Sequence, residues 1–159
     1  MAPLPKHLRP HWRYLAVGIE SWPDAAIDRN AFQRRVWYAA QNLFGDPGSA
    51  DLDCSVLQFR FEDGAGEAIV RTRRGEVERA RAALACVDAV EDDPVGIAVR
   101  GVSGTVRGCE EKYLGRGREH HVRRDVVYED AERPAVARDD AFDVRLDGDF
   151  AGATELDIK

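Results

Sequence analysis

Residues 54–73 consist of two alternating segments, Cys54-Ser-Val-Leu-Gln-Phe-Arg-Phe-Glu62 and Glu67-Ala-Ile-Val-Arg-Thr-Arg73, joined by Asp63-Gly-Ala-Gly66. Alternation of apolar and polar residues is typical of a strand with one buried face. Phe59 and Phe61 fall on one side of the first segment, and Arg60 falls on the other. The glycines in the turn allow the positive φ angles of a tight hairpin. These residues therefore predict two antiparallel strands.

A strand and a helix are predicted before this hairpin. Residues 13–20 alternate in the same way and predict a strand with one buried face. Residues 28–44 carry apolar side chains at helical spacing and predict a helix. Asp28 is the expected N-cap, and Gly45 followed by Pro47 is expected to end the helix.

Three further elements are predicted after the hairpin: a helix over 76–89, a strand over 94–106 and a short helix over 109–115. The resulting order is strand, helix, strand, strand, helix, strand. This order predicts a ferredoxin-like α+β fold, in which a four-stranded antiparallel sheet carries two helices on one face, followed by the short C-terminal helix and an acidic tail.

We expect three parts along the chain of 159 residues. They are an extended arm over 1–11 with basic and proline residues, the ferredoxin-like domain over 12–117, and an acidic, flexible tail over 118–159. The charge follows this division, because residues 1–124 have a net charge of +1 and residues 125–159 one of −7.

The basic residues are almost all arginine. Arginine supplies 20 of the 23, and lysine occurs only at Lys6, Lys112 and Lys159. An acidic protein with so few lysines is typical of a cytoplasm of very high salt, where acidic surfaces maintain solubility. A GC-rich genome that favours arginine codons is the alternative; it explains the few lysines but not the excess of acidic residues. Salt weakens phosphate binding, so an RNA-binding protein of such a cell is expected to use stacking and bidentate arginine contacts.

Several classes of protein are disfavoured by composition. Cys54, Cys86 and Cys109 are three in number and widely spaced, which argues against a disulfide framework or a zinc ribbon. No apolar run approaches the roughly 18 residues of a membrane span, and the first residues lack the apolar core of a signal peptide. We therefore expect a cytoplasmic protein with no membrane partner.

No catalytic arrangement is visible in the sequence. The strand over 67–73 has no aromatic residue, which excludes base stacking of the RNA-recognition-motif type on that strand. An acylphosphatase needs a glycine-rich anion loop, which 21–24 does not supply, and both asparagines, Asn30 and Asn42, fall on the first predicted helix. His120-His121 is expected to be a surface pair and not a metal site. A stand-alone module that binds a ligand or dimerises remains an alternative.

A basic scaffold for RNA is the remaining interpretation. Arg60, Arg71, Arg73 and Arg100 are predicted to project from one sheet face, either toward RNA or simply into solvent. Arg73-Arg74-Gly75 precedes a predicted helix whose N-terminus favours phosphate, although an ordinary turn accounts for it as well.

The segment Val102-Ser-Gly-Thr-Val-Arg-Gly-Cys-Glu-Glu-Lys-Tyr113 combines glycines with Thr105, Arg107, Lys112 and Tyr113. Gly104 and Gly108 allow close approach of the backbone to a ligand. These residue types suit phosphate or ribose contacts with stacking, and the end of a strand before a helix explains them equally well.

Four segments in order resemble the archaeal ribonuclease P protein component 2 family: Leu8-Arg-Pro-His-Trp-Arg-Tyr-Leu-Ala-Val-Gly-Ile19, Leu43-Phe-Gly-Asp46, Ala68-Ile-Val-Arg71 and Ser103-Gly-Thr-Val-Arg-Gly-Cys-Glu-Glu-Lys-Tyr113. The resemblance runs from about residue 9 to residue 116. It implies a ferredoxin-like subunit of the ribonucleoprotein endonuclease that removes the 5′ leader of precursor tRNA. The acidic extension resembles halophilic versions of the family.

The resemblance also implies the partners. They are the ribonuclease P RNA, protein component 3 in a heterotetramer, other ribonuclease P proteins, and precursor tRNA as the substrate of the complex. The chain itself is expected to contribute no catalytic residue, no metal ligand and no bound cofactor, because the RNA subunit and its Mg²⁺ ions perform the hydrolysis. From the motifs and the predicted basic face, we expect RNA-binding residues at Arg13, Tyr14, Arg71, Arg73, Arg74, Thr105, Arg107, Lys112 and Tyr113.

Overall fold

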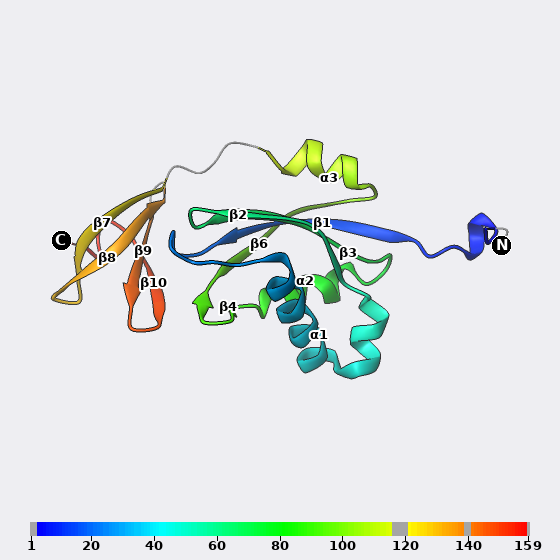
Figure 1. Ribbon diagram of the computed structural model, residues 1–159, viewed down its shortest axis with the longest axis horizontal. Coiled ribbons are helices and arrows are strands. Elements are labelled where there is room, and N and C mark those ends of the chain that lie inside the picture. The colour runs from blue at the N-terminus through cyan, green and yellow to red at the C-terminus, as the bar shows by residue number, and fades with distance from the viewer. Residues whose placement is uncertain (1–2, 116–120, 139–140, 159) are drawn as a thin grey trace.

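The computed structural model describes residues 3–115, 121–138 and 141–158 (Figure 1). Two four-stranded antiparallel sheets dominate the chain, the first within residues 12–103 and the second within residues 121–153. Within the described ranges, no helix combines the length and the apolar character needed to cross a membrane.

The first sheet has the ferredoxin-like topology. Its strand order is β2-β3-β1-β6, and its strands are β1 (Trp12–Glu20), β2 (Ser55–Glu62), β3 (Ala65–Arg73) and β6 (Gly96–Ser103). Helices α1 (Arg29–Leu52) and α2 (Val77–Ala85) lie together on one face (Figure 1). The predicted fold class is therefore confirmed.

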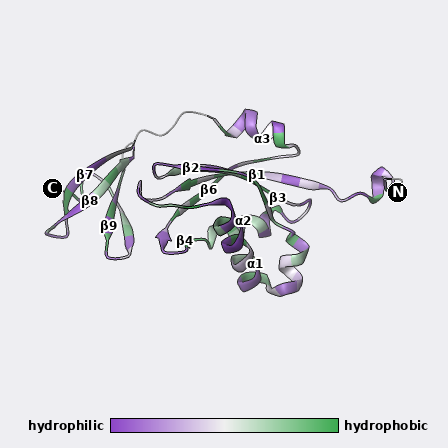
Figure 2. Cartoon of the chain, viewed as in Figure 1, coloured by the Kyte–Doolittle hydropathy of each residue, from purple (hydrophilic) through white to green (hydrophobic). Residues whose placement is uncertain are grey.

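The main core lies between this sheet and the two helices. The strands contribute Leu15, Val17 and Val70, and α1 contributes Phe32, all without exposed surface. The rings of Phe32 and Phe59 lie 5.5 Å apart between centroids. Green apolar positions alternate with purple polar ones along α1 and α2, as expected of helices with one buried side (Figure 2).

Helix α1 begins as predicted but continues further. The Asp28 side chain accepts a hydrogen bond from the backbone N–H of Ala31 at 2.7 Å, which confirms the N-cap. Gly45 kinks the helix with a φ of 73° instead of ending it. The second segment carries Pro47 near its start, where proline is tolerated because the first N–H groups of a helix have no acceptor.

The region after the hairpin differs from the predicted boundaries. Helix α2 ends at Ala85, and two short strands, β4 (Ala89–Val90) and β5 (Asp93–Pro94), form a small hairpin before β6. Strand β6 ends at Ser103, because Thr105 caps helix α3 (Val106–Tyr113), which begins earlier than predicted.

Helix α3 lies on the opposite face of the first sheet from α1 and α2 (Figure 1). Its buried Cys109 packs against Ala16 and Ile69, and these three residues form the centre of a small second core. The sheet face that was expected to be open is therefore covered at its centre.

The acidic C-terminal region is a sheet and not a tail, so that expectation was wrong. Its strand order is β10-β9-β8-β7, with β7 (His121–Tyr128), β8 (Ala131–Arg138), β9 (Ala141–Leu146) and β10 (Asp149–Ala153). Only Val144 and Leu146 hint at a strand from apolar alternation. The apolar side chains that form its core are small and sparse, namely Val126, Ala135, Phe142, Val144 and Ala153. The predicted boundary between 117 and 118 lies outside the described residues.

Arg138 attaches the second sheet to the first domain. Its side chain is 8% exposed and forms an ion pair with Asp143 at 2.6 Å, while Nη2 donates to the carbonyl oxygen of Ser21 at 2.9 Å. The rings of Trp22 and Phe150 meet edge to face at 6.1 Å. These contacts hold the acidic sheet beside the turn that follows β1.

Candidate RNA-binding surface

Strand register brings two of the predicted basic residues, Arg71 and Arg73, to the α3 side of the sheet. Trp12 pairs with Arg73, and Tyr14 pairs with both Arg71 and Ser103. Side chains at paired positions of antiparallel strands point to the same face. Trp12, Tyr14, Arg71 and Arg73 lie on this face. Arg13 pairs with Thr72 and so starts from the opposite face, and Arg74 lies in the turn after β3. We call these six residues together the Trp12 end of the sheet.

Trp12 is the centre of this group. The guanidinium carbon of Arg71 lies 3.9 Å from the indole centroid, and that of Arg73 lies 4.3 Å from it. Both distances are within the range of a cation–π interaction. Arg73 also forms an ion pair with Asp53 at 3.1 Å, whereas Arg71, Arg13 and Arg74 form none with the described residues. Three cations of the Trp12 end therefore have no carboxylate partner within the described ranges.

The start of α3 is built around Thr105 and Gly108. The Thr105 hydroxyl caps the helix by accepting a hydrogen bond from the Gly108 N–H at 3.0 Å. A Cβ at Gly108 would lie 2.5 Å from the Ser103 Oγ, so a larger residue there would have to displace the Ser103 side chain. Gly104 is more open, and the nearest atom to its ideal Cβ is a guanidinium nitrogen of Arg13 at 3.8 Å. The capping hydroxyl of Thr105 thus has a structural role beside the Trp12 end.

The other predicted residues of α3 do not join the Trp12 group. Arg107 is exposed and forms an ion pair with Glu111 at 2.8 Å. Lys112 is exposed near the C-terminal end of the helix. The ring of Tyr113 covers Gly101, whose ideal Cβ would lie 2.3 Å from it, so this tyrosine anchors α3 to β6.

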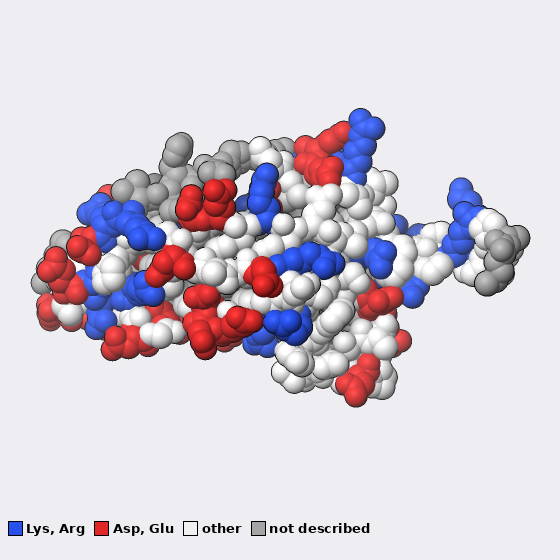
Figure 3. Space-filling model, viewed as in Figure 1, with Lys and Arg blue, Asp and Glu red and all other residues white. Residues whose placement is uncertain are grey.

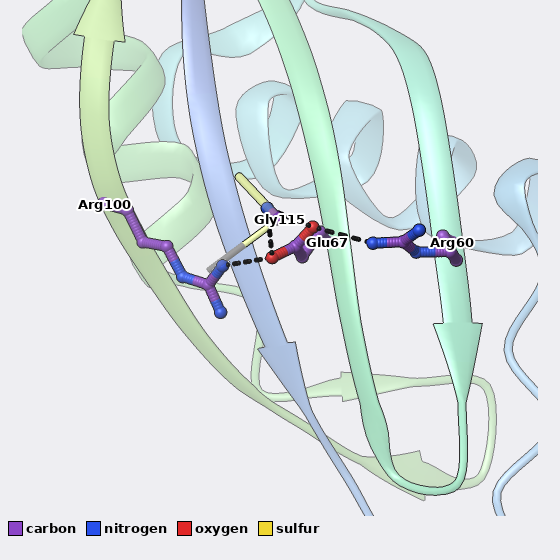
Figure 4. Close-up of polar contacts among 4 residues, drawn as sticks. All are labelled: Arg60, Glu67, Arg100 and Gly115. Atoms are coloured by element: carbon purple, nitrogen blue, oxygen red, sulfur yellow. Dashed lines mark hydrogen bonds and ion pairs between the residues drawn. The ribbon is translucent and has the colours of Figure 1, made fainter. Parts of the chain in front are cut away.

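Arg60 and Arg100 project from the same sheet face, as predicted, but at its other end (Figure 4). Glu67 accepts hydrogen bonds from Arg100 at 2.7 Å and from Arg60 at 3.2 Å. The backbone N–H of Gly115 donates to the same carboxylate at 3.4 Å. We call Arg60, Glu67, Arg100 and Gly115 the Glu67 end; its two arginines share one carboxylate, which offsets one of their two positive charges.

Trp12 and Glu67, which organise the two ends of the sheet face, were not among the predicted site residues. Trp12 precedes Tyr14 by two positions in an alternating strand, which places both on one face. Its role as a platform depends on its pairing with Arg73, which no local pattern specifies. Glu67 lies 33 residues from Arg100 in the sequence, and only the sheet brings the two together.

In the part of the chain that the structure describes, the thiols and the remaining polar groups show no catalytic arrangement. Burial raises the pKa of the Cys54 thiol from 9.0 to about 11, and burial also raises the pKa of the Cys109 thiol. Such neutral, buried thiols are poor nucleophiles. Among the described residues, no three His, Cys, Asp or Glu side chains are grouped as a metal ion would require. His120 lies outside the described residues.

Comparison with known proteins gives consistent matches. Residues 13–114 match the model of the Rpp14/Pop5 family. A protein of Natronomonas pharaonis named ribonuclease P protein component 2 is 62% identical over 159 residues, covering 100% of this chain and 99% of the relative. A protein of the same name from Haloarcula marismortui is 60% identical over 161 residues and covers 100% of both chains.

A more distant protein of that name, from Methanopyrus kandleri, is 35% identical and covers 81% of this chain and 82% of the relative. A chain in the cryo-EM structure of yeast ribonuclease MRP matches with a TM-score of 0.46 and 16% identity, covering 63% of this chain and 79% of that chain. The match to the family model includes the four strands of the first sheet from residue 13 onward, and two relatives match along the whole length of the chain. The chain therefore belongs to the Rpp14/Pop5 family.

Proposed function

We propose that this chain is a non-catalytic protein subunit of ribonuclease P that binds the RNA subunit and stabilises its catalytic domain. In this proposal the complex removes the 5′ leader of precursor tRNA in the cytoplasm. The observation that carries it is the Trp12 end, where two guanidinium groups lie on an indole ring and Arg13, Arg71 and Arg74 form no ion pair with described residues.

The Trp12 end suits structured RNA for physical reasons. An arginine stacked on an aromatic ring keeps a fixed orientation and so loses little freedom when it binds a phosphate through two N–H groups. RNA binding through such directional arginine contacts depends less on the net charge of the protein than binding through scattered lysines does. They fit an acidic protein with a net charge of −6 that binds a polyanion.

The hydrolysis is assigned to the RNA subunit. Mg²⁺ bound by that RNA supplies the chemistry in this proposal, and the chain itself holds phosphate groups so that the RNA keeps its active shape. The buried, neutral thiols of Cys54 and Cys109 support a non-catalytic role. The expected effect of the chain is therefore a lower requirement for Mg²⁺.

Protein component 3 is the proposed protein partner, in a heterotetramer that joins other ribonuclease P proteins. Helix α1, on the opposite face from α3, exposes three large apolar side chains, namely Trp37 at 46%, Tyr38 at 56% and Leu43 at 45%. An uncovered apolar face of this kind is typical of a protein contact. RNA and component 3 would then occupy opposite faces of the sheet.

Reconstitution tests the proposal. Cognate ribonuclease P RNA and component 3, with and without this chain, are assayed for cleavage of precursor tRNA across Mg²⁺ concentrations at high salt. We expect the chain to restore cleavage at lower Mg²⁺. The Arg71→Ala/Arg73→Ala double variant should lose this gain, while Arg60→Ala/Arg100→Ala should keep it.

Two outcomes would contradict the proposal. Cleavage that is unchanged by the chain, while component 3 is shown to bind, would reject the subunit role. Equal loss in the two double variants, with both proteins folded by circular dichroism, would reject the Trp12 end as the RNA contact. Arg107→Ala, in the same assay, tests the predicted contact on α3.

A further inference from the structure

The N-terminal arm, residues 3–11, projects away from the first sheet as a continuation of β1 (Figure 1). All nine residues are exposed. The arm has a local structure, since a short 3₁₀ helix, η1 (Lys6–Leu8), closes with a hydrogen bond from the Leu8 N–H to the Pro5 carbonyl at 2.8 Å. Arg9 donates to the carbonyl of Leu4 at 2.6 Å. It is therefore a shaped segment with few contacts to the rest of the chain.

The arm leaves the body at the Trp12 end. The N–H of Arg74 donates to the carbonyl of His11 at 2.8 Å, which joins the base of the arm to the turn after β3. The next residue along the chain is Trp12 itself. The arm therefore begins directly beside the Trp12 end, which is the proposed RNA-binding surface.

The charge of the arm is opposite to that of the protein as a whole. Residues 1–11 contain Lys6 and Arg9, together with two histidines, and no acidic residue. Within the described part of the chain, neither Lys6 nor Arg9 forms an ion pair. Several other arginines of this acidic protein do, including Arg34, Arg79 and Arg145. Two unneutralised cations on an exposed segment are a favourable site for a polyanion.

The acidic sheet is at the opposite end of the molecule from the arm (Figure 1). Red acidic atoms are numerous over that end in the space-filling view, with blue basic atoms among them (Figure 3). Residues 125–159 alone carry a net charge of −7. An approaching polyanion is therefore repelled by one end and attracted by the other, which turns the arm and the Trp12 end toward it.

From these observations we infer that the arm is a second RNA-binding element, in which Lys6 and Arg9 hold phosphate groups next to those bound at the Trp12 end. This inference rests on the proposed RNA-binding function and extends it to a segment outside the sheet. Pro3, Pro5 and Pro10 limit the conformations of the free arm, so less entropy is lost when RNA orders it. Exposed Leu4 and Leu8 would then lie against ribose or base edges.

The test measures the affinity of the full chain for cognate ribonuclease P RNA by fluorescence anisotropy, over a series of salt concentrations. The variant is Lys6→Ala/Arg9→Ala. Removing two phosphate contacts should weaken binding and lower the slope of log affinity against log salt by about 1.4–1.8. The charge-conserving Lys6→Arg/Arg9→Lys variant should keep the wild-type slope.

The matched control is Arg34→Ala/Arg81→Ala, which removes two exposed arginines from α1 and α2 on the far face. It should leave the slope close to wild type. If Lys6→Ala/Arg9→Ala matches this control, the inference is wrong. A loss of affinity for component 3, with the RNA slope unchanged, would also overturn it, since the arm would then be a protein contact.

The Arg71→Ala/Arg73→Ala variant separates failure of the arm from failure of the function. Should that variant lose RNA affinity while the arm variant does not, the proposed function stands and the role of the arm falls. Absence of RNA binding by the wild-type chain would reject both.

Discussion

The Trp12 end and the Glu67 end lie on the same sheet face and carry the same residue type, yet they differ in charge. At the Trp12 end, Arg71 and Arg73 lie on an indole ring, and only Arg73 has a carboxylate partner. At the other end, Arg60 and Arg100 share Glu67. The number of arginines on a sheet therefore does not identify a nucleic-acid surface, because their neighbours decide how much positive charge remains.

The burial of the two acidic partners strengthens this contrast. The side chain of Glu67 is 16% exposed, against 42% for Asp53. A less exposed carboxylate is less screened by water and salt, so it holds its cations more firmly. In a cell of very high salt, the Glu67 pair should persist while the Asp53 pair weakens. We expect salt to increase the difference between the ends.

The largest expected effect comes from removing the platform of the Trp12 end. Trp12→Ala removes the surface that orients two arginines, and base–aromatic contacts contribute about 1–3 kcal/mol each. RNA affinity should fall by as much as about 100-fold at fixed salt. Tyr38→Ala, which removes an exposed aromatic residue from α1, is the matched control. Equal affinities of the two variants would show that the indole is not part of the RNA surface.

The domain that carries the Trp12 end should become less stable at high pH, because it contains the buried thiol of Cys54. Burial raises the pKa of Cys54 from 9.0 to about 11, so the folded state favours the neutral thiol. The stability that this represents is complete below pH 9 and is lost as pH rises toward 11. The loss is on the order of 2–3 kcal/mol.

Denaturant unfolding at a series of pH values measures this loss. Cys54→Ala should reduce the alkaline decrease in stability, while Cys86→Ala, at an exposed thiol, should not. If Cys54→Ala shows the same decrease as the wild type, ionisation of Cys54 is not its cause.

Helix α3 separates the two ends, and its position can be tested at Gly101. A Cβ there would lie 2.3 Å from the ring of Tyr113, so Gly101→Ala must displace the ring. Such overpacking costs about 1–3 kcal/mol of unfolding free energy. Gly104→Ala is the control, because its Cβ would have 3.8 Å of space.

Thiol labelling reports the same change locally. Cys109 belongs to α3 and is buried between this helix and the sheet, and exposed Cys86 serves as an internal reference. The Gly101→Ala variant should label faster at Cys109 alone. Unchanged labelling together with unchanged stability would show that Tyr113 does not anchor the helix.

The smallest expected effect is a gain at the Glu67 end. Glu67→Gln removes the negative charge that Arg60 and Arg100 share, so RNA affinity should rise about two- to fivefold, in line with the strength of surface ion pairs. Glu91→Gln, which releases exposed Arg34 on the far face, should have no such effect. A decrease in affinity for Glu67→Gln would indicate that this end contacts RNA in its neutralised form.

Much of the fold could be predicted because its elements have local signatures. The Asp63-Gly64 turn, the alternation on either side of it and the Asp28 cap each depend on residues close in sequence. The kink at Gly45 was missed because a glycine and a nearby proline also end helices. The C-terminal sheet was missed because its core side chains are small and its many carboxylates resemble a solvated tail.

The candidate site was predicted less completely than the fold. Arg71 and Arg73 were found from their place on an alternating strand, and Tyr113 was found from a motif. Trp12, Asp53 and Glu67 were absent from the prediction because their importance depends on partners from other strands. Thr105 and Tyr113 have structural roles in holding α3, and their contact with RNA stays a prediction.

The amino-acid sequence by itself determined the order of the elements in the ferredoxin-like domain and the face on which its arginines project, since both follow from periodicity along the chain. Only the tertiary structure decided which of those arginines share a carboxylate. Ion pairs and cation–π contacts act over a few ångströms in space, and the residues that form them here come from different strands. The division of one sheet face into two ends is for that reason a property of the folded protein.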